Sequence, residues 1–377
     1  MDRTVVVLDI GSSKISVLAG TRGVNDTICI KAFDETGYSG FQDGEFFEPE
    51  KVALAIKKSI LSVQRLTRVL PRTVWVGVPG EFSTSVCRDA GVAFRSRRKV
   101  TELDVSDLYD GADVFRGNRD YTVTDRTAVC FTLDDSLKTL RPVGETCSKL
   151  SARLCFVLAE KKFTAFVSKI LTGLGVEEVK FVSALLAEGK YLYDEESREV
   201  NQVLVDAGFI TTSVAVFRGD GMVMTKTFPM GGGHITADLC ECLHMSYEDA
   251  DLLKGKVSLN LEVAEDEKYD LGNGKTQLCT IVHQIIFDRL DMFAKLIKRC
   301  LAEAGLENER NISLTGGGLA YLKGARGYLS RQLATDIEVL SPRLPAVGKP
   351  EMSSVYAVCD LALSRERRRS FWSRIFH

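Results

Sequence analysis

The sequence contains no long hydrophobic run. Its longest apolar stretches, such as 5–8, fall far short of the roughly 18 residues needed to cross a bilayer. Asp9 interrupts the only apolar stretch near the start, so we expect no signal peptide. With 45% hydrophobic and 27% charged residues in a chain of 377, the composition is typical of a soluble globular protein large enough for two lobes.

Metal-binding and nucleotide fingerprints are also missing. The ten cysteines include no CxxC pair, and only four histidines are present. Cys240 and Cys242 lie closest together but have no second pair of ligands, which disfavours a metal site. We interpret the cysteines as reduced thiols of a cytosolic protein. Neither GxxxxGK[ST] nor GxGxxG occurs, which argues against P-loop and Rossmann nucleotide sites.

Positive charge is scarce except at the end of the chain. The net charge is −2 in total, but residues 365–377 carry five Arg and one Glu, which leaves −6 for residues 1–364. An acidic body argues against nucleic acid as the main partner.

The sequence does contain an internal repeat. The segments "VVVLDIGSSKISVLAG" (5–20) and "QVLVDAGFITTSVAVFRG" (202–219) each combine a buried-type strand, Asp-x-Gly, hydroxyl residues and a second apolar strand. Each segment therefore predicts a β-hairpin with a polar tip. Their repetition favours a duplicated α/β unit with a cleft between the halves. The alternative is two unrelated hairpins, because Asp and Gly are common in turns.

The chemistry of these tips suits a phosphate. A tight tip containing Gly presents successive backbone N–H groups to an anion, and Ser or Thr hydroxyls add donors. Asp9 and Asp206, at the two strand ends, can hold the water shell of Mg²⁺. Two facing tips would clamp a triphosphate from both sides.

Two glycine clusters extend the same pattern. "ISLTGGGLAYLKGA" (312–325) predicts a strand, a triple-Gly turn and a helix, and "PMGGGHITADL" (229–239) repeats the turn and helix. Bare backbone at a helix N-terminus allows a flat ligand to lie close. Asp251 and Lys254 then share one helix face at i, i+3. Either cluster could equally be an ordinary loop.

Taken together, these motifs resemble the FtsA family of bacterial actin-like cell-division proteins, within the actin, Hsp70 and sugar-kinase superfamily. "LDIGSSKISVLAG" resembles its first phosphate motif, "LTGGGLAYLKGA" its adenosine motif, and "VTELDVSDL" with "RPVGETCSKLSARL" its inserted subdomain. The resemblance implies an α/β fold, namely a duplicated actin-like (ribonuclease H-like) fold with two lobes around a nucleotide cleft and an FtsA-type inserted subdomain. The implied ranges are 1–81 and 161–195 for lobe 1, 82–160 for the insert, 196–245 and 305–363 for lobe 2, 246–304 for its outer subdomain, and 364–377 for a membrane-targeting tail.

The resemblance also implies an ATP site with Mg²⁺ held through water by Asp9 and Asp206. The implied nucleotide-binding residues are Asp9, Gly11, Ser12, Ser13, Lys14, Asp206, Gly208, Thr211, Thr212, Gly231, Gly232, Gly233, Asp251, Lys254, Gly316, Gly317 and Gly318. Asp251 stands where the family usually has Glu. In the second phosphate motif, Phe209 and Ile210 replace two glycines and Ser213 replaces an Asp. Because a β-branched Ile cannot adopt positive φ without strain, we expect weak or absent ATP turnover.

As a function, the resemblance implies an ATP-binding, polymer-forming protein that tethers FtsZ to the cytoplasmic face of the membrane at the division site and recruits later division proteins. The alternatives are an enzyme of the sugar-kinase type, for which no catalytic base stands out, and a binding module like the pilus-assembly protein PilM. A PilM-like protein should lack an amphipathic tail.

The sequence of the tail predicts a helix that lies in the membrane interface. At about 100° per residue, its bulky apolar side chains share one sector of about 140°. We expect anionic lipid to contact Arg365, Arg367, Arg368, Arg369, Phe371, Trp372, Ile375 and Phe376. The alternative is a tail packed on its own body or on a neighbouring subunit.

By the same resemblance, the FtsZ C-terminal peptide docks on the subdomain at 246–304. Lys295, Lys298 and Arg299 form a basic helix face that could receive an acidic peptide, or could be ordinary solvated charge.

Overall fold

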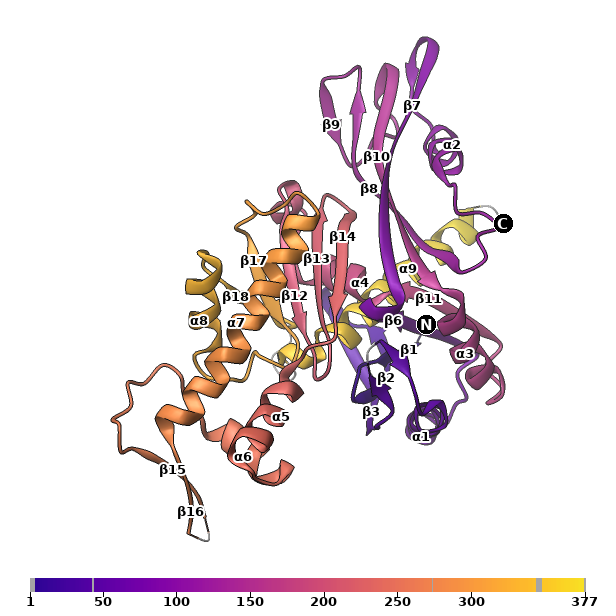
Figure 1. The fold of residues 1–377 in the computed structure, drawn as a ribbon. Helices are drawn as coiled ribbons and strands as arrows, with labels where there is room; N and C mark the ends of the chain where they lie inside the picture. The colour runs from indigo at the N-terminus through magenta and orange to yellow at the C-terminus, as the bar shows by residue number, and fades with distance from the viewer. Residues whose placement is uncertain (1–3, 43, 273, 344–347, 376–377) are drawn as a thin grey trace.

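Two lobes, each built on a five-stranded sheet, lie side by side, and each carries one further unit (Figure 1). The structure, a computed structural model, describes residues 4–42, 44–272, 274–343 and 348–375, and for residues 42 and 368–375 it describes the backbone alone. One helix of 23 residues, α9 (Ser353–Ile375), runs behind both lobes and ends below the inserted unit.

Lobe 1 has the strand order β11-β6-β1-β2-β3. Its strands are β1 (Val5–Ile10), β2 (Lys14–Arg22), β3 (Ile28–Gly37), β6 (Thr73–Val78) and β11 (Glu178–Ser183). Alternate residues of β1 point to opposite faces, as the pleat requires. Val6 and Leu8 pack with α1 (Pro49–Thr67) and α3 (Lys161–Thr172), whereas Val5 and Val7 pack with α4 (Ala184–Leu192) and α9. Burial on both faces explains why β1 is almost entirely apolar.

Lobe 2 repeats this topology with the order β14-β13-β12-β17-β18. Its strands are β12 (Gln202–Ala207), β13 (Thr212–Arg218), β14 (Gly221–Phe228), β17 (Ile312–Thr315) and β18 (Glu338–Val339). β12 pairs antiparallel with β13 and parallel with β17, just as β1 pairs antiparallel with β2 and parallel with β6. The predicted duplication of an α/β unit is therefore confirmed.

Helices α5 (Gly232–Leu243), α7 (Cys279–Glu303) and α8 (Ala325–Leu333) bury one apolar face each against the lobe 2 sheet. The lower part of this lobe consists of α6 (Tyr247–Lys256), the hairpin β15 (Lys268–Gly272) and β16 (Lys275–Leu278), and the first turns of α7. Near lobe 1, a second small hairpin joins β4 (Phe41–Gln42) to β5 (Glu45–Phe46).

The inserted unit of lobe 1 is a four-stranded antiparallel sheet with one helix, α2 (Glu102–Ala112). Its strands are β7 (Ser83–Lys99), β8 (Tyr121–Leu133), β9 (Leu137–Thr139) and β10 (Thr146–Glu160). Thr101 begins α2 with a capping box, in which its hydroxyl accepts from Asp104 N and its own N–H donates to the Asp104 carboxylate at 2.8 Å. These elements lie between residues 83 and 160.

One expectation about the cysteines is wrong. Cys87 of β7 and Cys155 of β10 lie directly opposite each other, with their Cα atoms 4.2 Å apart, and form a disulfide. Directly opposed residues of an antiparallel pair bring their Cβ atoms close together, and this register is set by folding rather than by spacing in sequence. The eight other cysteines are free thiols, and three of them, Cys147, Cys279 and Cys359, are buried.

Helix α9 also differs from the expected domain ranges. We expected residues up to 363 to belong to lobe 2, but Val355, Val358 and Cys359 pack in the core of lobe 1. The helix then continues through Ile375 without a linker, so the tail extends a core helix rather than forming a separate one. Among the described residues, no helix is long and apolar enough to cross a membrane.

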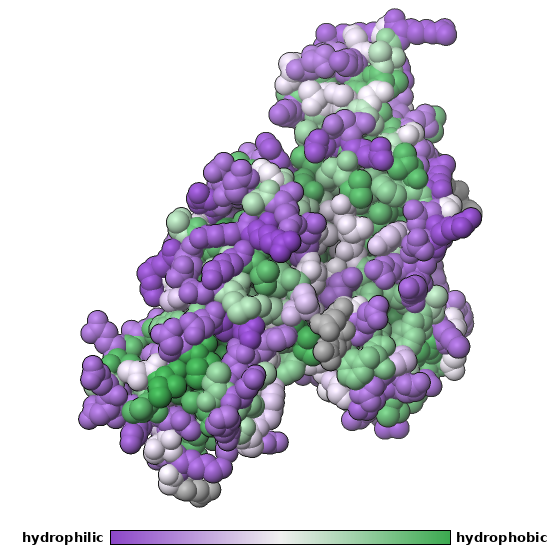
Figure 2. Space-filling model, in the orientation of Figure 1, coloured by the Kyte–Doolittle hydropathy of each residue, from purple (hydrophilic) through white to green (hydrophobic). Residues whose placement is uncertain are grey.

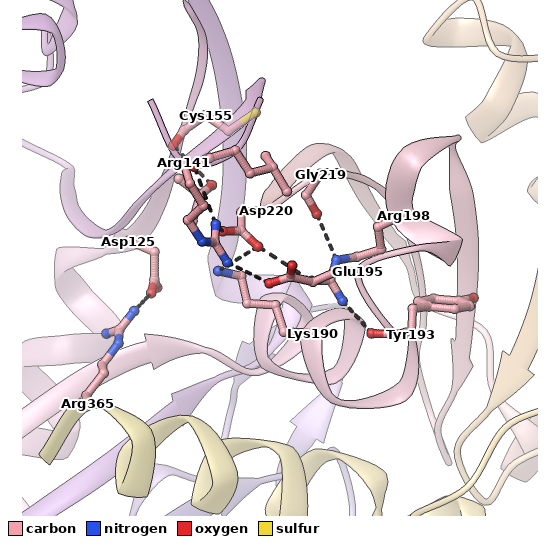
Figure 3. Close-up of polar contacts among 12 residues, drawn as sticks. Asp125, Arg141, Cys155, Lys190, Tyr193, Glu195, Arg198, Gly219, Asp220 and Arg365 are labelled. Atoms are coloured by element: carbon pink, nitrogen blue, oxygen red, sulfur yellow. Dashed lines mark hydrogen bonds and ion pairs between the residues drawn. The ribbon is translucent and has the colours of Figure 1, made fainter. Parts of the chain in front are cut away.

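The inserted unit is fastened to its neighbours by ion pairs (Figure 3). Arg141, beyond β9, lies 3.3 Å from Asp220 and 2.6 Å from Glu195. On another side, the fully buried carboxylate of Asp125 in β8 pairs with Arg365 of α9 and accepts a hydrogen bond from Ser183 N at 3.1 Å. The insert is therefore tied both to lobe 2 and to the helix that carries the tail.

Candidate functional site

A cleft of about 450 Å³ lies between the two lobes, where the β1–β2 and β12–β13 hairpin tips face each other. Both hairpins come from the repeated segment, so the duplication places two similar tips around one space. The sequence-predicted residues that line it are Asp9, Gly11, Ser12, Ser13, Lys14, Asp206, Gly208, Thr211, Gly232, Lys254, Gly316, Gly317 and Gly318.

The first tip is a tight turn. Gly11 N donates to Lys14 O at 3.0 Å, and the Tyr38 hydroxyl donates to Gly11 O at 2.6 Å. Lys14 lines the cleft, yet its Nζ lies 2.7 Å from a carboxylate oxygen of Glu35 on the neighbouring strand. The turn thus presents backbone and hydroxyl donors to the cleft, beside one ammonium group that is already paired.

The second tip has the same closure, with Gly208 N donating to Thr211 O at 2.9 Å. Its two substituted residues do not strain it, because neither Phe209 nor Ile210 is among the described non-glycine residues with positive φ. The tip therefore turns with ordinary backbone angles instead of the left-handed ones that two glycines would permit.

Two direct hydrogen bonds join the second tip to lobe 1 across the cleft. Ile210 N donates to Ser12 Oγ at 3.1 Å, and the Thr211 hydroxyl donates to Glu81 in the short helix Gly80–Phe82. Two of the hydroxyl residues expected to face a phosphate thus bond to the opposite lobe. A bound anion at this position would have to take over these donors.

The glycine clusters let backbone segments approach the second tip closely. Gly316 has φ of +82°, and a Cβ there would lie 2.3 Å from Asp206 Oδ1. A Cβ on Gly232 would lie 2.2 Å from Gly318 O. The two clusters therefore pack against each other as well as lining the cleft, which is more than a loop of arbitrary conformation requires.

Two half-buried carboxyl groups, those of Asp9 and Asp206, stand at the strand ends that carry the tips. Burial raises the pKa of Asp9 to about 6, against a hydrogen bond that Ser354 Oγ donates to it at 2.6 Å and the nearby charge of Lys14, both of which lower it. Burial, with the charges of Glu81 and Asp9, raises the pKa of Asp206 to about 7. A carboxylate that is poorly solvated by water is stabilised by a bound cation or by taking up a proton.

Besides Glu351, two further acidic residues of the cleft were missed by the sequence analysis. Glu188 lies on α4, and burial together with the charges of Asp206 and Asp9 holds its pKa well above the usual range. Burial likewise raises the pKa of Glu81, although the hydrogen bond from Thr211 lowers it. Both sit in short apolar or Gly-Pro contexts, where nothing in the local sequence indicates that their side chains face a cleft.

The opposite end of the cleft is formed by Lys254, Tyr321 and Glu351. Lys254 Nζ donates to Thr236 Oγ1 at 2.6 Å and lies 2.9 Å from Asp251 Oδ1. The Tyr321 hydroxyl donates to Glu351, so an aromatic ring and a carboxylate lie side by side at the mouth. This end of the cleft combines an aromatic ring with one basic and one acidic side chain. Such a lining can contact both the flat base and the polar groups of a nucleoside.

Four of the sequence-predicted residues do not line the cleft. Thr212 is fully buried and its hydroxyl donates to Met230 O at 2.7 Å, so it stabilises the hairpin itself. Gly231 and Gly233 contact the second tip from behind, and Asp251 reaches the cleft only through Lys254. Thr212 was expected to hold phosphate because the sequence cannot tell which of two adjacent threonines points inward across a strand.

The residues present fit a divalent cation with a phosphate chain. Asp9 and Asp206 come from opposite lobes, and one carboxylate oxygen of Glu188, Oε2, is buried without a hydrogen-bond partner in the described structure. No three His, Cys, Asp or Glu side chains of the described ranges are close enough together to ligate a metal directly. The arrangement therefore suits an ion that keeps its water shell, as Mg²⁺ does.

Comparison with known sequences finds one family repeatedly. Residues 203–357 match the family described as Cell division protein FtsA. The chain is 22% identical over 370 residues to cell division protein FtsA of Bacillus subtilis, covering 96% of this chain and 84% of that protein. It is 21% identical over 358 residues to FtsA of Escherichia coli, covering 90% and 85%.

Solved structures of actin-like proteins share the fold. A PilM–PilN type IV pilus biogenesis complex superposes with a TM-score of 0.63 at 16% identity, covering 95% of this chain and 98% of that chain. MreB5 of Spiroplasma citri bound to AMPPNP gives 0.53 at 12% identity, covering 99% and 98%. With two duplicated sheets around an interlobe cleft, the chain has an actin-like fold, and it is similar to FtsA cell-division proteins over most of its length.

Proposed function

We propose that the chain is a cell-division protein of the FtsA family, which binds Mg·ATP in the interlobe cleft and tethers FtsZ filaments to the cytoplasmic membrane at the division site. The observation that carries the proposal is the pair of hairpin tips, one from each repeat, with a half-buried Asp at the base of each. A ligand that contacts both tips links the two lobes, so its binding would favour one relative orientation of the lobes.

In this proposal, the two hairpin tips, including the hydroxyl of Ser13, receive the phosphates. Asp9 and Asp206 hold the water shell of Mg²⁺, which supplies charge neutralisation to the phosphate chain when bound. The end of the cleft proposed to receive the nucleobase is lined by Lys254, Tyr321 and Glu351. The S. citri MreB5 structures, of similar fold, contain AMPPNP and ADP.

Binding is expected to exceed turnover. The second tip lacks the glycines that would let its backbone approach a terminal phosphate, and it bonds to Ser12 instead. Calorimetry with ATP and ADP should show binding to the wild type and its loss in Asp9→Ala. Steady phosphate release at roughly 1 s⁻¹ or faster, an ordinary enzyme rate, would contradict an adaptor role for the cleft.

For the partner, we propose that the FtsZ C-terminal peptide docks on the lower part of lobe 2. Figure 2 shows hydrophobic side chains gathered over α6 and the first turns of α7, and the exposed apolar residues there include Leu252, Leu261 and Ile281. On α7, Lys295 and Lys298 are exposed and Arg299 pairs with Glu303 at 2.8 Å. An apolar patch and, about 20 Å further along α7, a basic face suit an extended peptide with both apolar and acidic side chains.

For the membrane, we propose that the tail at 368–377 lies in the lipid interface. Arg365 and Arg367, which we expected to contact lipid, instead pair with Asp125 and Asp26 of the body. The side chains of Arg368, Arg369, Phe371, Trp372 and Ile375, and all of Phe376, lie outside the described residues, so their role remains a prediction from the sequence. The proposed anchor is accordingly shorter at its start than the range 364–377.

One experiment separates this function from the alternatives. The full chain and FtsZ filaments are mixed with anionic vesicles and sedimented. Retention of FtsZ on vesicles only when the chain is present supports a tether. A chain that binds neither lipid nor FtsZ would favour a PilM-like module, for which the likeness to the PilM–PilN structure shows the fold alone. Phosphate transfer from ATP to a sugar would favour the kinase alternative.

A further inference from the structure

Glu188 is buried in a way that ordinary packing does not explain. It lies on α4, where it is only 2% exposed, and it lines the floor of the interlobe cleft. Its Oε2 atom is buried and accepts no hydrogen bond within the described residues. A buried carboxyl oxygen without a partner is costly, so its retention calls for a ligand that completes its interactions.

The neighbours of Glu188 increase this cost rather than relieve it. The charges that act on it most strongly are those of Asp206 and Asp9, which have the same sign. Lys14, the cation that acts on Asp9, already lies 2.7 Å from Glu35. In the described structure, no ion pair joins Glu188 to a basic side chain.

The nearest basic residue along the chain, Lys190, serves another contact. Its Nζ lies 3.9 Å from Asp220, at the junction with the inserted unit (Figure 3). Residues two apart on a helix do not share a face, so Lys190 points away from the cleft while Glu188 points into it. The floor of the cleft therefore collects negative charge from three elements, β1, β12 and α4.

We propose that Glu188 is a third carboxylate of the cation site, so that a hydrated divalent cation is held by Asp9, Asp206 and Glu188 together. An all-oxygen surrounding of carboxylates and water, with no sulfur or imidazole, favours hard cations such as Mg²⁺ and Mn²⁺. Because no three acidic side chains of the described ranges can ligate one ion directly, the contacts pass through the water shell. The Glu188 oxygen then accepts from a metal-bound water.

This role goes beyond a two-carboxylate site in one measurable respect. A third carboxylate brings the negative charge around the divalent cation from −2 to −3, so the cation binds more tightly without the phosphates of a nucleotide than it would at two carboxylates. The inference rests on the proposed function, because it places the cation in the cleft that is proposed to bind Mg·ATP. Cation binding in the absence of nucleotide nevertheless tests it separately.

The experiment titrates Mn²⁺ into the full chain and follows free Mn²⁺ by electron paramagnetic resonance, with and without ADP. Glu188→Gln, which keeps the shape and removes the charge, should weaken Mn²⁺ binding on the order of 10-fold, as loss of an outer-shell partner does. Glu188→Asp, which keeps the charge but withdraws it by one methylene, should lie between. Glu196→Gln makes the same chemical change at an exposed site and should bind like the wild type.

The outcomes are distinct. If folded Glu188→Gln, checked by circular dichroism, binds Mn²⁺ as tightly as the wild type in both arms, the inference is overturned while nucleotide binding stands. If the wild type binds no ADP but still binds Mn²⁺ in a Glu188-dependent manner, the proposed nucleotide function fails and the cation site stands. If Glu188→Gln does not fold, the comparison of Glu188→Asp with the wild type decides, and equal affinity overturns the inference.

Discussion

Buried acidic groups in the cleft are the residues whose chemistry departs most from ordinary behaviour. Asp206 has a pKa of about 7 because burial disfavours its charged form. Without a cation, such a group must keep a proton or remain charged at a cost. The ligand-free protein should therefore show this cost in its stability.

We predict that ligand-free protein loses stability as pH rises. The folded pKa of Asp206 lies above its ordinary value, so the folded state binds more protons than the unfolded state between about pH 4 and pH 7, and the free energy of unfolding falls across this window. Asp206→Asn removes this contribution and should be more stable than the wild type at about pH 8, by on the order of 2 kcal/mol.

Urea denaturation at about pH 5 and about pH 8 measures the effect, with the exposed Asp107→Asn as a control of equal chemistry. An Asp206→Asn variant whose stability declines with pH as steeply as the wild type would contradict the assignment.

Among the elements, α9 combines two roles that are usually separate. It begins at the cleft, where Ser354 donates to Asp9, crosses the core of lobe 1, and carries the tail at its other end. Glu366 is 6% exposed and lies 2.6 Å from Lys180, so the helix is still bound to the body at that point. The body therefore ends, and the tail begins, near residue 367.

We predict that deletion of 368–377 abolishes sedimentation with anionic vesicles and leaves the fold intact. Deletion from 365 should in addition lower stability, because it removes Arg365 and leaves the buried Asp125 unpaired. Trp372→Glu with Phe376→Glu should release the protein from vesicles as the shorter deletion does, since charges oppose insertion of the apolar face. If the shortened chain pellets with vesicles as well as the full chain, the tail is not the anchor.

Helix α7 gives a second prediction at this scale. Reversing the charge at Lys295, Lys298 and Arg299 should weaken binding of the FtsZ C-terminal peptide, and binding to the wild type should weaken with rising salt. Fluorescence anisotropy of a labelled peptide measures both. Leu252→Ser on the exposed apolar patch is the companion variant, and unchanged affinity in both variants would move the docking site elsewhere.

At the scale of the whole molecule, Asp125 joins three parts. It belongs to β8 of the insert, accepts from Ser183 N at the start of α4, and pairs with Arg365 of α9. Its carboxylate is fully buried, so removing the charge leaves Arg365 without its partner at a protected site. The insert, the floor of the cleft and the root of the tail are thus connected through one side chain.

We predict that Asp125→Asn lowers the free energy of unfolding by about 3 kcal/mol, within the range for breaking a buried ion pair. Hydrogen exchange should speed up in β8 and in the last core turns of α9, because these segments lose a shared contact. Asp135→Asn, in the exposed turn after β8, is the control and should change neither measurement. Faster exchange confined to β8 would show that the tail root is held independently.

Local patterns determined much of the fold and part of the site. The Asp-x-Gly segments predicted both hairpins and their duplication, because strand alternation and turn residues are properties of neighbouring positions. The glycine runs indicated close backbone approach for the same reason: Gly316 and Gly232 leave no room for a Cβ. These features need no knowledge of distant contacts.

Only the tertiary structure decided which buried faces meet. Glu188 lies in an almost wholly buried helix, so its periodicity does not tell which side faces the cleft. The choice of lobe for α9, the register that joins Cys87 to Cys155, and the pairing of Arg365 with Asp125 each depend on residues tens to hundreds of positions apart. Such contacts form because whole sheets and helices pack together, and no short stretch of sequence carries that information.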